Sequence, residues 1–106
     1  MWTVETLNEA VDAELEALPK DLRARLVRIM TLIEAVGLES LPTDAVKHLE
    51  GKLWELRVKA ASGISRAIYV TASGRRVVIV RVFVKKTQKT PQRELDLARA
   101  RAKEVK

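Results

Sequence analysis

The sequence predicts an α+β fold in which helices pack against one face of a small, mainly antiparallel sheet. Two patterns support this prediction. Between residues 7 and 36 the apolar side chains recur at helical spacing, whereas between residues 53 and 85 they alternate with the period of strands. The 106 residues suit one hydrophobic core, so we expect residues 1–106 to form a single domain.

The first element expected is a short strand, because residues 2–4 alternate apolar and polar side chains. A helix follows, with Thr6 or Asn8 as its N-terminal cap. One face of this helix is apolar and consists of Leu7, Val11, Leu15 and Leu18. Pro19 ends the helix.

A second helix is predicted to start at Asp21, which is placed to cap it, and to run to Gly37. Its expected buried side chains are Leu22, Leu26, Ile29, Met30, Ile33 and Val36. Because the connection to the first helix is short, the two should form an antiparallel hairpin. Residues 38–50, which include Pro42, are predicted to be a connecting loop.

Three consecutive strands are expected next, over Leu53–Lys59, Ile64–Thr71 and Val77–Lys85, with turns between them. In the first strand, Trp54 is predicted to belong to the core. In the longest strand, one face should pack on the helices through Val78, Val80, Val82 and Val84. A last helix is expected to follow Thr90 and Pro91, with the hydroxyl as its cap and proline at its first position.

The composition limits the classes of function. The chain contains no cysteine, which rules out disulfides, thiolate metal ligands and cysteine nucleophiles. No metal-ligand cluster, glycine-rich phosphate loop or cofactor motif is recognisable, so we expect neither metal nor cofactor. No apolar run is long enough to span a bilayer, and the first residues lack the features of a secretory signal. We therefore expect a cytoplasmic protein without a membrane partner.

Charge is distributed unevenly along the chain, whose net charge is +6 and whose pI is near 10. Residues 1–21 contain one base and six acids, whereas residues 85–106 contain eight bases and three acids. A concentrated basic surface attracts phosphate backbones through counterion release. The distribution favours a nucleic-acid or ribosomal partner for the C-terminal half.

Cationic side chains should gather on the sheet face that the helices leave free. Alternation places Arg57, Arg81 and Lys85 on that face, and Arg66 is expected on the same side of the neighbouring strand. Lys86, Thr87 and Lys89 follow directly. Such a cluster can bind consecutive phosphates and stabilise the negative charge of a phosphorane during strand cleavage.

Two aromatic side chains, Tyr69 and Phe83, offer surfaces on which an unstacked base could lie. His48, the only histidine, is expected to be an ordinary surface residue. A nuclease without paired histidines or carboxylates would have to activate the 2′-hydroxyl of its RNA substrate with Lys, Arg or an aromatic hydroxyl. This chemistry needs RNA held in line by something else, because orientation can supply roughly 7–11 kcal/mol of a barrier. A ribosome that presents mRNA in its decoding site meets that need.

Three segments together carry a family resemblance: LEGKLWELR at residues 49–57, SRAIY at residues 65–69 and FVKKTQKTP at residues 83–91. In their order and spacing they resemble the phage-derived, HigB-like branch of the RelE/HigB/ParE toxin superfamily, and the flanking helices fit the layout of that superfamily. The resemblance implies the toxin of a type II toxin–antitoxin pair, a ribosome-dependent endoribonuclease that cleaves translated mRNA. Its implied partners are a helix-turn-helix, HigA-like antitoxin, the ribosome and mRNA.

The same resemblance implies catalytic roles for Arg57, Arg66, Lys85 and Lys86, with Phe83 and Thr87 in support. Some relatives use a C-terminal histidine or tyrosine as proton carrier, but residues 92–106 contain neither. Lys85 and Lys86 therefore remain the candidates for general base and acid. Arg81, Tyr69 and Lys89 complete the predicted RNA-binding set. A ParE-like inhibitor of DNA gyrase and a non-catalytic RNA- or ribosome-binding module are the alternative functions, because fold alone does not separate them.

Overall fold

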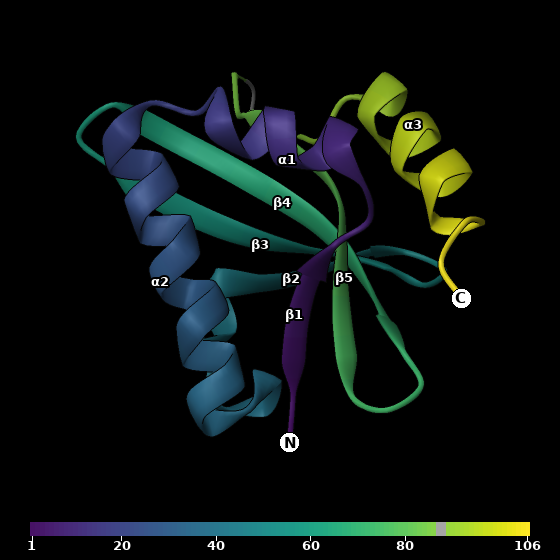
Figure 1. Cartoon of the computed structure of the whole chain (residues 1–106). Helices are drawn as coiled ribbons and strands as arrows, with labels where there is room; N and C mark the ends of the chain where they lie inside the picture. The colour runs from purple at the N-terminus through teal and green to yellow at the C-terminus, as the bar shows by residue number, and fades with distance from the viewer. Residues whose placement is uncertain (87–88) are drawn as a thin grey trace.

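The computed structural model describes residues 1–86 and 89–106 and has the predicted α+β architecture (Figure 1). In chain order its elements are β1 (Thr3–Thr6), α1 (Glu9–Glu16), α2 (Lys20–Val36), the 3-10 helices η1 (Leu38–Ser40) and η2 (Thr43–Ala45), β2 (Val46–Glu50), β3 (Leu53–Ala60), β4 (Gly63–Ala72), β5 (Arg76–Val84) and α3 (Gln92–Ala102). The strands form one sheet in the order β1-β5-β4-β3-β2. β1 pairs with β5 in parallel, and the other neighbours pair antiparallel. No helix in the described ranges is long and apolar enough to cross a membrane.

The prediction of a loop over residues 38–50 is wrong at its C-terminal end. Residues 46–50 form β2, an edge strand that pairs with the first half of β3. Its exposed side chains include Lys47 and His48, so β2 lacks the apolar alternation by which the buried strands were recognised. Packing against β3, rather than local sequence, makes this segment a strand.

The ends of the helices follow the sequence only in part. The Asn8 side chain caps α1 and accepts a hydrogen bond from the backbone N–H of Val11 at 3.2 Å. For α2 the predicted cap is wrong, because Pro19 occupies the cap position and Asp21 lies inside the first turn. The Asp21 carboxylate instead accepts hydrogen bonds from the backbone N–H groups of Leu22 (2.8 Å) and Ser62 (2.9 Å). It thereby ties α2 to the turn between β3 and β4.

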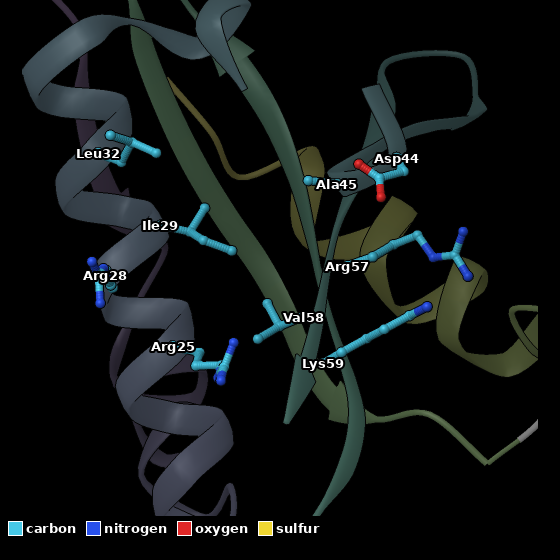
Figure 2. Close-up of a pocket in the computed structure, with 9 residues that line it drawn as sticks. All are labelled: Arg25, Arg28, Ile29, Leu32, Asp44, Ala45, Arg57, Val58 and Lys59. Carbon is cyan, nitrogen blue, oxygen red and sulfur yellow. The ribbon is translucent and has the colours of Figure 1, made fainter. Parts of the chain in front are cut away.

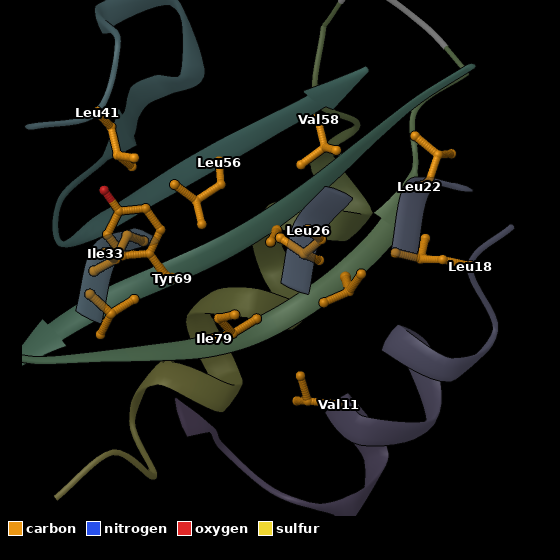
Figure 3. Close-up of a cluster of buried hydrophobic side chains, with 13 residues drawn as sticks. Val11, Leu18, Leu22, Leu26, Ile33, Leu41, Leu56, Val58, Tyr69 and Ile79 are labelled. Carbon is orange, nitrogen blue, oxygen red and sulfur yellow. The ribbon is translucent and has the colours of Figure 1, made fainter. Parts of the chain in front are cut away.

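Helices cover parts of both sheet faces. Figure 3 shows the larger core, in which α1, α2 and the turn between them pack against side chains of β3, β4 and β5. These elements supply Val11, Leu18, Leu22, Leu26 and Ile33. A second cluster forms beneath α3 and includes Leu53, Ile68, Val70, Val78, Val80 and Ala98. The second face is therefore covered by α3 at one end, and any working surface on it lies at the other end.

A β-bulge in β5 reverses the alternation that the sequence shows. Ile68 pairs with Arg81 and Tyr69 pairs with Ile79, so Val80 has no cross-strand partner. Before the bulge Val78 and Val80 lie under α3, whereas after it Val82 lies in the core of α1 and α2. The prediction of one continuous valine face is therefore wrong.

Trp54 also departs from its predicted place. Its side chain is 38% exposed, so it is not a core residue. The indole lies against the ring of His48, its partner on β2, with ring centroids 4.7 Å apart. The imidazole Nε2 is 2.8 Å from the carbonyl oxygen of Gly51. His48 is thus an exposed residue that supports the β2–β3 turn.

Candidate functional site

Two arginines lie directly opposite each other on neighbouring strands. Arg57 of β3 pairs with Arg66 of β4, and Arg66 in turn pairs with Phe83 of β5. All three occupy one row on the sheet face that carries α3, and Arg66 and Phe83 lie near the N-terminal end of that helix. Like charges directly opposite each other destabilise a sheet, so the arrangement requires either compensation or a function.

Arg66 is compensated by groups from two other elements. Its guanidinium lies 3.2 Å from the carboxylate of Glu55, and both side chains are buried, with 1% and 0% exposed. The same Nη1 donates a hydrogen bond to the hydroxyl of Thr90, which in turn donates to Glu55 Oε2 at 3.1 Å. Breaking a buried pair of this kind leaves a desolvated charge and costs about 3–5 kcal/mol. The triad of Glu55, Arg66 and Thr90 therefore holds the guanidinium in one position.

The sequence did not single out Thr90 or Glu55 for this role. Thr90 was predicted to cap the last helix, but Pro91 is at the cap position of α3 and the Thr90 side chain is 8% exposed and turned inward. Glu55 lies between Trp54 and Leu56 in an otherwise largely apolar stretch of strand. An acidic side chain in such a strand needs a buried partner, and this is the signal that could have indicated its role.

Arg57 differs from Arg66 in having no acidic partner among the described residues. Its side chain is half-buried, and its Nε has no hydrogen-bond acceptor in the parts of the chain that the structure describes. A buried donor without an acceptor costs free energy, which an anionic ligand would recover. Arg57 is therefore placed to bind a phosphate.

Lys85 lies at the end of the same face. Its backbone N–H donates to the carbonyl oxygen of Ile64 at 2.7 Å, which extends the pairing of β4 and β5 by one residue. Desolvation, followed by the positive charges of Arg66 and Arg57, lowers the pKa of Lys85 below its usual value. A lysine that gives up its proton more readily is a better general base near neutral pH.

A cavity of about 400 Å³ connects these groups to the segment before α3. It is lined by Arg66, Phe83, Lys85, Lys86, Lys89, Thr90, Pro91 and Arg93, together with Arg81, Val84 and Glu94. Lys86 and Lys89 are exposed, and Phe83 is half-buried. The structure thus brings together all the predicted catalytic residues except Arg57 in this cavity, and Arg57 adjoins it through its pairing with Arg66. Thr87, predicted to bind RNA, lies outside the described residues.

Arg81 lines the cavity but is held by two carboxylates. Its guanidinium makes a bidentate contact with Glu94, at 2.6 and 3.1 Å, and lies 2.9 Å from Glu14. The hydrogen bond to Glu94, more than any other contact, raises the pKa of Arg81. Arg81 also lies over the ring of Phe83, 5.7 Å from its centroid. These contacts give Arg81 a structural role, and its predicted contact with RNA stays a prediction.

Glu14 stabilises the bulge beside Arg81. Its carboxylate accepts a hydrogen bond from the backbone N–H of Val82 at 3.1 Å and lies 2.7 Å from Arg101. Arg101 in turn donates to the carbonyl oxygen of Val80 at 2.9 Å. Helices α1 and α3 therefore satisfy backbone groups that β5 exposes where β1 ends. No local pattern in the sequence indicates these contacts.

Tyr69 does not belong to this surface. It lies on the opposite sheet face, in the core of α1 and α2, with 1% of its surface exposed (Figure 3). Burial raises its pKa to about 12. The prediction that Tyr69 offers a stacking surface for a base is wrong for this position, because Arg66 and Tyr69 are three residues apart on one strand and so face opposite ways. No group of three or more metal-ligating side chains occurs within residues 1–86 and 89–106.

One known protein family matches most of the chain. Residues 13–103 match the family described as phage derived protein Gp49-like (DUF891). The chain belongs to this family. Gp49-like proteins are associated with toxins of the RelE/HigB type. No curated protein matches the chain at a significant level.

Proposed function

We propose that this Gp49-like protein is the toxin of a type II toxin–antitoxin pair and acts as a HigB-like, ribosome-dependent mRNA endoribonuclease. The observation that supports it most directly is the basic cavity that brings Lys85 and Lys86 together with Arg66. Desolvation there, followed by the positive charges of Arg66 and Arg57, lowers the pKa of Lys85. Perturbed proton affinity in a charged cavity is typical of catalytic groups. The association of the family with toxins of the RelE/HigB type supports the same proposal.

In the proposed reaction the 2′-hydroxyl of one nucleotide attacks the adjacent phosphorus. Neutral Lys85 accepts the hydroxyl proton as the new P–O2′ bond forms. The P–O5′ bond breaks, and Lys86 donates a proton to the leaving 5′-oxygen. The products are a 2′,3′-cyclic phosphate and a 5′-hydroxyl. No water, oxidant or reductant is consumed.

Two arginines supply the positive charge that stabilises the negatively charged phosphorane. Arg57, which lacks an acidic partner among the described residues, is proposed to bind a non-bridging oxygen. Arg66 is held by Glu55 and Thr90 and supplies a fixed positive charge that needs no reorganisation during the reaction. Lys89 is proposed to bind a flanking phosphate, and Phe83 to lie against a base.

The ribosome supplies what these residues do not. None of them orients the 2′-hydroxyl, the phosphorus and the leaving oxygen in line, so we propose that mRNA in the ribosomal A site is the substrate. The reaction then takes place in the cytoplasm, and a helix-turn-helix antitoxin restrains it. Cationic side chains take the place that a metal ion would have at the phosphate, so the proposed reaction is metal-independent.

Brief expression in bacteria, with mRNA 5′ ends mapped by primer extension, tests this proposal. The test variant is Lys85→Ala/Lys86→Ala, and the matched control is Lys20→Ala/Lys103→Ala, which removes two exposed lysines elsewhere. We expect cuts within translated codons that disappear in the test variant, persist in the control and require translation initiation.

Other outcomes contradict the proposal in distinct ways. Growth arrest with intact mRNA would overturn it in favour of a ParE-like gyrase inhibitor. Salt-sensitive binding to ribosomes without any cleavage would indicate a non-catalytic RNA-binding module. Cleavage that is independent of translation would leave a nuclease but remove the ribosome from the mechanism.

A further inference from the structure

One edge of the sheet is left open halfway along β3. β2 starts at Val46, which pairs with Leu56, and beyond this point the outer edge of β3 continues through residues 57–60. Within the described residues no strand or loop backbone bonds to that stretch of edge. About half of its backbone N–H and C=O groups point away from β4, because these groups alternate in direction along a strand. An open edge of this kind can accept a further strand.

A groove of about 530 Å³ runs along this edge, between β3 and α2. Figure 2 shows Val58 pointing toward Ile29 of α2, whereas Arg57 and Lys59 point to the other side of the strand. The wall formed by α2 is partly apolar, and Leu32 is 41% exposed there. The groove therefore combines unpaired backbone with an uncovered apolar wall.

The charged side chains at the groove are mainly cationic: Arg25, Arg28, Arg57 and Lys59, with Asp44 at one end. Arg25 and Arg28 are exposed and form no ion pair within the described residues. Acidic side chains would complement them. An RNA strand would satisfy the same charges, but it has no N–H and C=O ladder for the edge of β3 and no aliphatic side chains for Ile29 and Leu32.

Strand geometry predicts the pattern of an occupant. Successive side chains of an added strand point to opposite sheet faces, as those of β3 do. One set would lie beside Val58 against Ile29 and Leu32, and the other set beside Arg57 and Lys59. The occupant should therefore alternate apolar and acidic side chains.

We propose that this groove binds an extended, acidic segment of a partner protein, which pairs with β3 over residues 57–60 as an additional strand. Its acidic side chains on one face come next to Arg57. Since Arg57 belongs to the candidate site, a bound segment neutralises that site and prevents phosphate binding; this consequence rests on the proposed function. The binding itself does not depend on it.

The test uses the full chain and a fluorescein-labelled peptide of alternating glutamate and valine, followed by fluorescence anisotropy. Three comparison ligands are a peptide of the same composition with glutamates and valines in separate blocks, the alternating peptide N-methylated at every second residue, and a single-stranded RNA of similar charge. We expect the alternating peptide to bind at least about tenfold more tightly than the block and N-methylated peptides, which cannot present both side-chain sets or pair with the edge.

Variants of the protein locate the binding. Arg28→Glu should weaken binding of the alternating peptide about tenfold or more, whereas Lys103→Glu, an exposed charge reversal at the C-terminal end of α3, should change it little. Amide hydrogen exchange should show new protection confined to part of residues 57–60. Neither substitution lies in the proposed catalytic set, so mRNA cleavage should persist in both.

Four results would overturn the inference: equal binding of the alternating and block peptides, equal binding of the N-methylated peptide, protection elsewhere in the chain, or RNA binding that Arg28→Glu weakens as much as peptide binding. The last would assign the groove to nucleic acid. Peptide binding with edge protection in a chain that never cleaves mRNA would support the inference while the proposed function fails. Cleavage of mRNA by a chain that does not bind the alternating peptide would support the proposed function and overturn the inference.

Discussion

The carboxylate of Glu55 and the guanidinium of Arg66 lie 3.2 Å apart inside the protein, on neighbouring strands and on the face that bears α3. Both side chains are withdrawn from solvent. Arg57, directly across from Arg66, has no comparable acid among the described residues. One arginine of this pair is therefore fixed and compensated, and the other is open to an anion. The surroundings of these two arginines lead to predictions for Glu55, Thr90 and Lys85, and the burial of Tyr69 on the opposite sheet face leads to a fourth.

Replacing Glu55 by Ala should lower the free energy of unfolding by about 3–5 kcal/mol, because Arg66 would remain buried without its carboxylate. Urea denaturation measures this. The double variant Glu55→Leu/Arg66→Met should recover most of the loss, since apolar side chains of similar size replace both charges. A double variant as unstable as Glu55→Ala alone would contradict the importance of the buried charge.

Replacing Thr90 by Val should cost about 1–3 kcal/mol, because the hydroxyl that bridges Arg66 and Glu55 is lost without a change of shape. Thr90→Ser should restore the bridge. Thr90→Asp, a good helix cap, separates the two roles of the residue. If Thr90 only capped α3, the aspartate variant would match the parent in thermal unfolding; we expect it to be less stable, because a second carboxylate would face Glu55.

The lowered pKa of Lys85 predicts a pH dependence of cleavage. A neutral Lys85 is the proposed base, so the rate should rise with pH, and the midpoint of this rise should lie below the usual pKa of lysine. In Arg57→Gln the loss of a neighbouring positive charge should raise the pKa of Lys85 and move its titration to higher pH. NMR titration of the Lys85 side chain measures this pKa in both proteins independently of activity. A titration that is identical in Arg57→Gln and the parent would exclude the arginine as a cause.

The only tyrosine of the chain, Tyr69, should ionise with a pKa of about 12 in the folded protein and near its usual value in denaturant. Because the folded pKa is the higher one, this group stabilises the fold fully below pH 10, and its contribution is lost as pH rises from about 10 toward 12. Absorbance of the phenolate follows both states. Tyr69→Phe should abolish the absorbance change; ionisation of the native protein near pH 10 would mean that the ring is exposed.

The sequence by itself determined the order of the three α-helices and of every strand except β2, together with most of their bounds. Apolar side chains spaced for a helix in residues 7–36 and alternating from Leu53 onward are local signals, and each requires burial of one face. The motif residues Arg57, Arg66 and Lys85 were also recognisable, and the structure places them on one face as alternation predicts. These features survive because side-chain direction along a regular strand depends only on position.

Only the tertiary structure decided what these residues meet. The bulge at Val80 divides the valine run of β5 between two cores, and Glu14 and Arg101 satisfy backbone groups beside it from two different helices. The hydroxyl of Thr90 was expected to cap α3, but it donates a hydrogen bond to the buried carboxylate of Glu55 on β3. In each case the deciding partner lies far away in the chain, and the cost of an unsatisfied buried polar group outweighs the local preference.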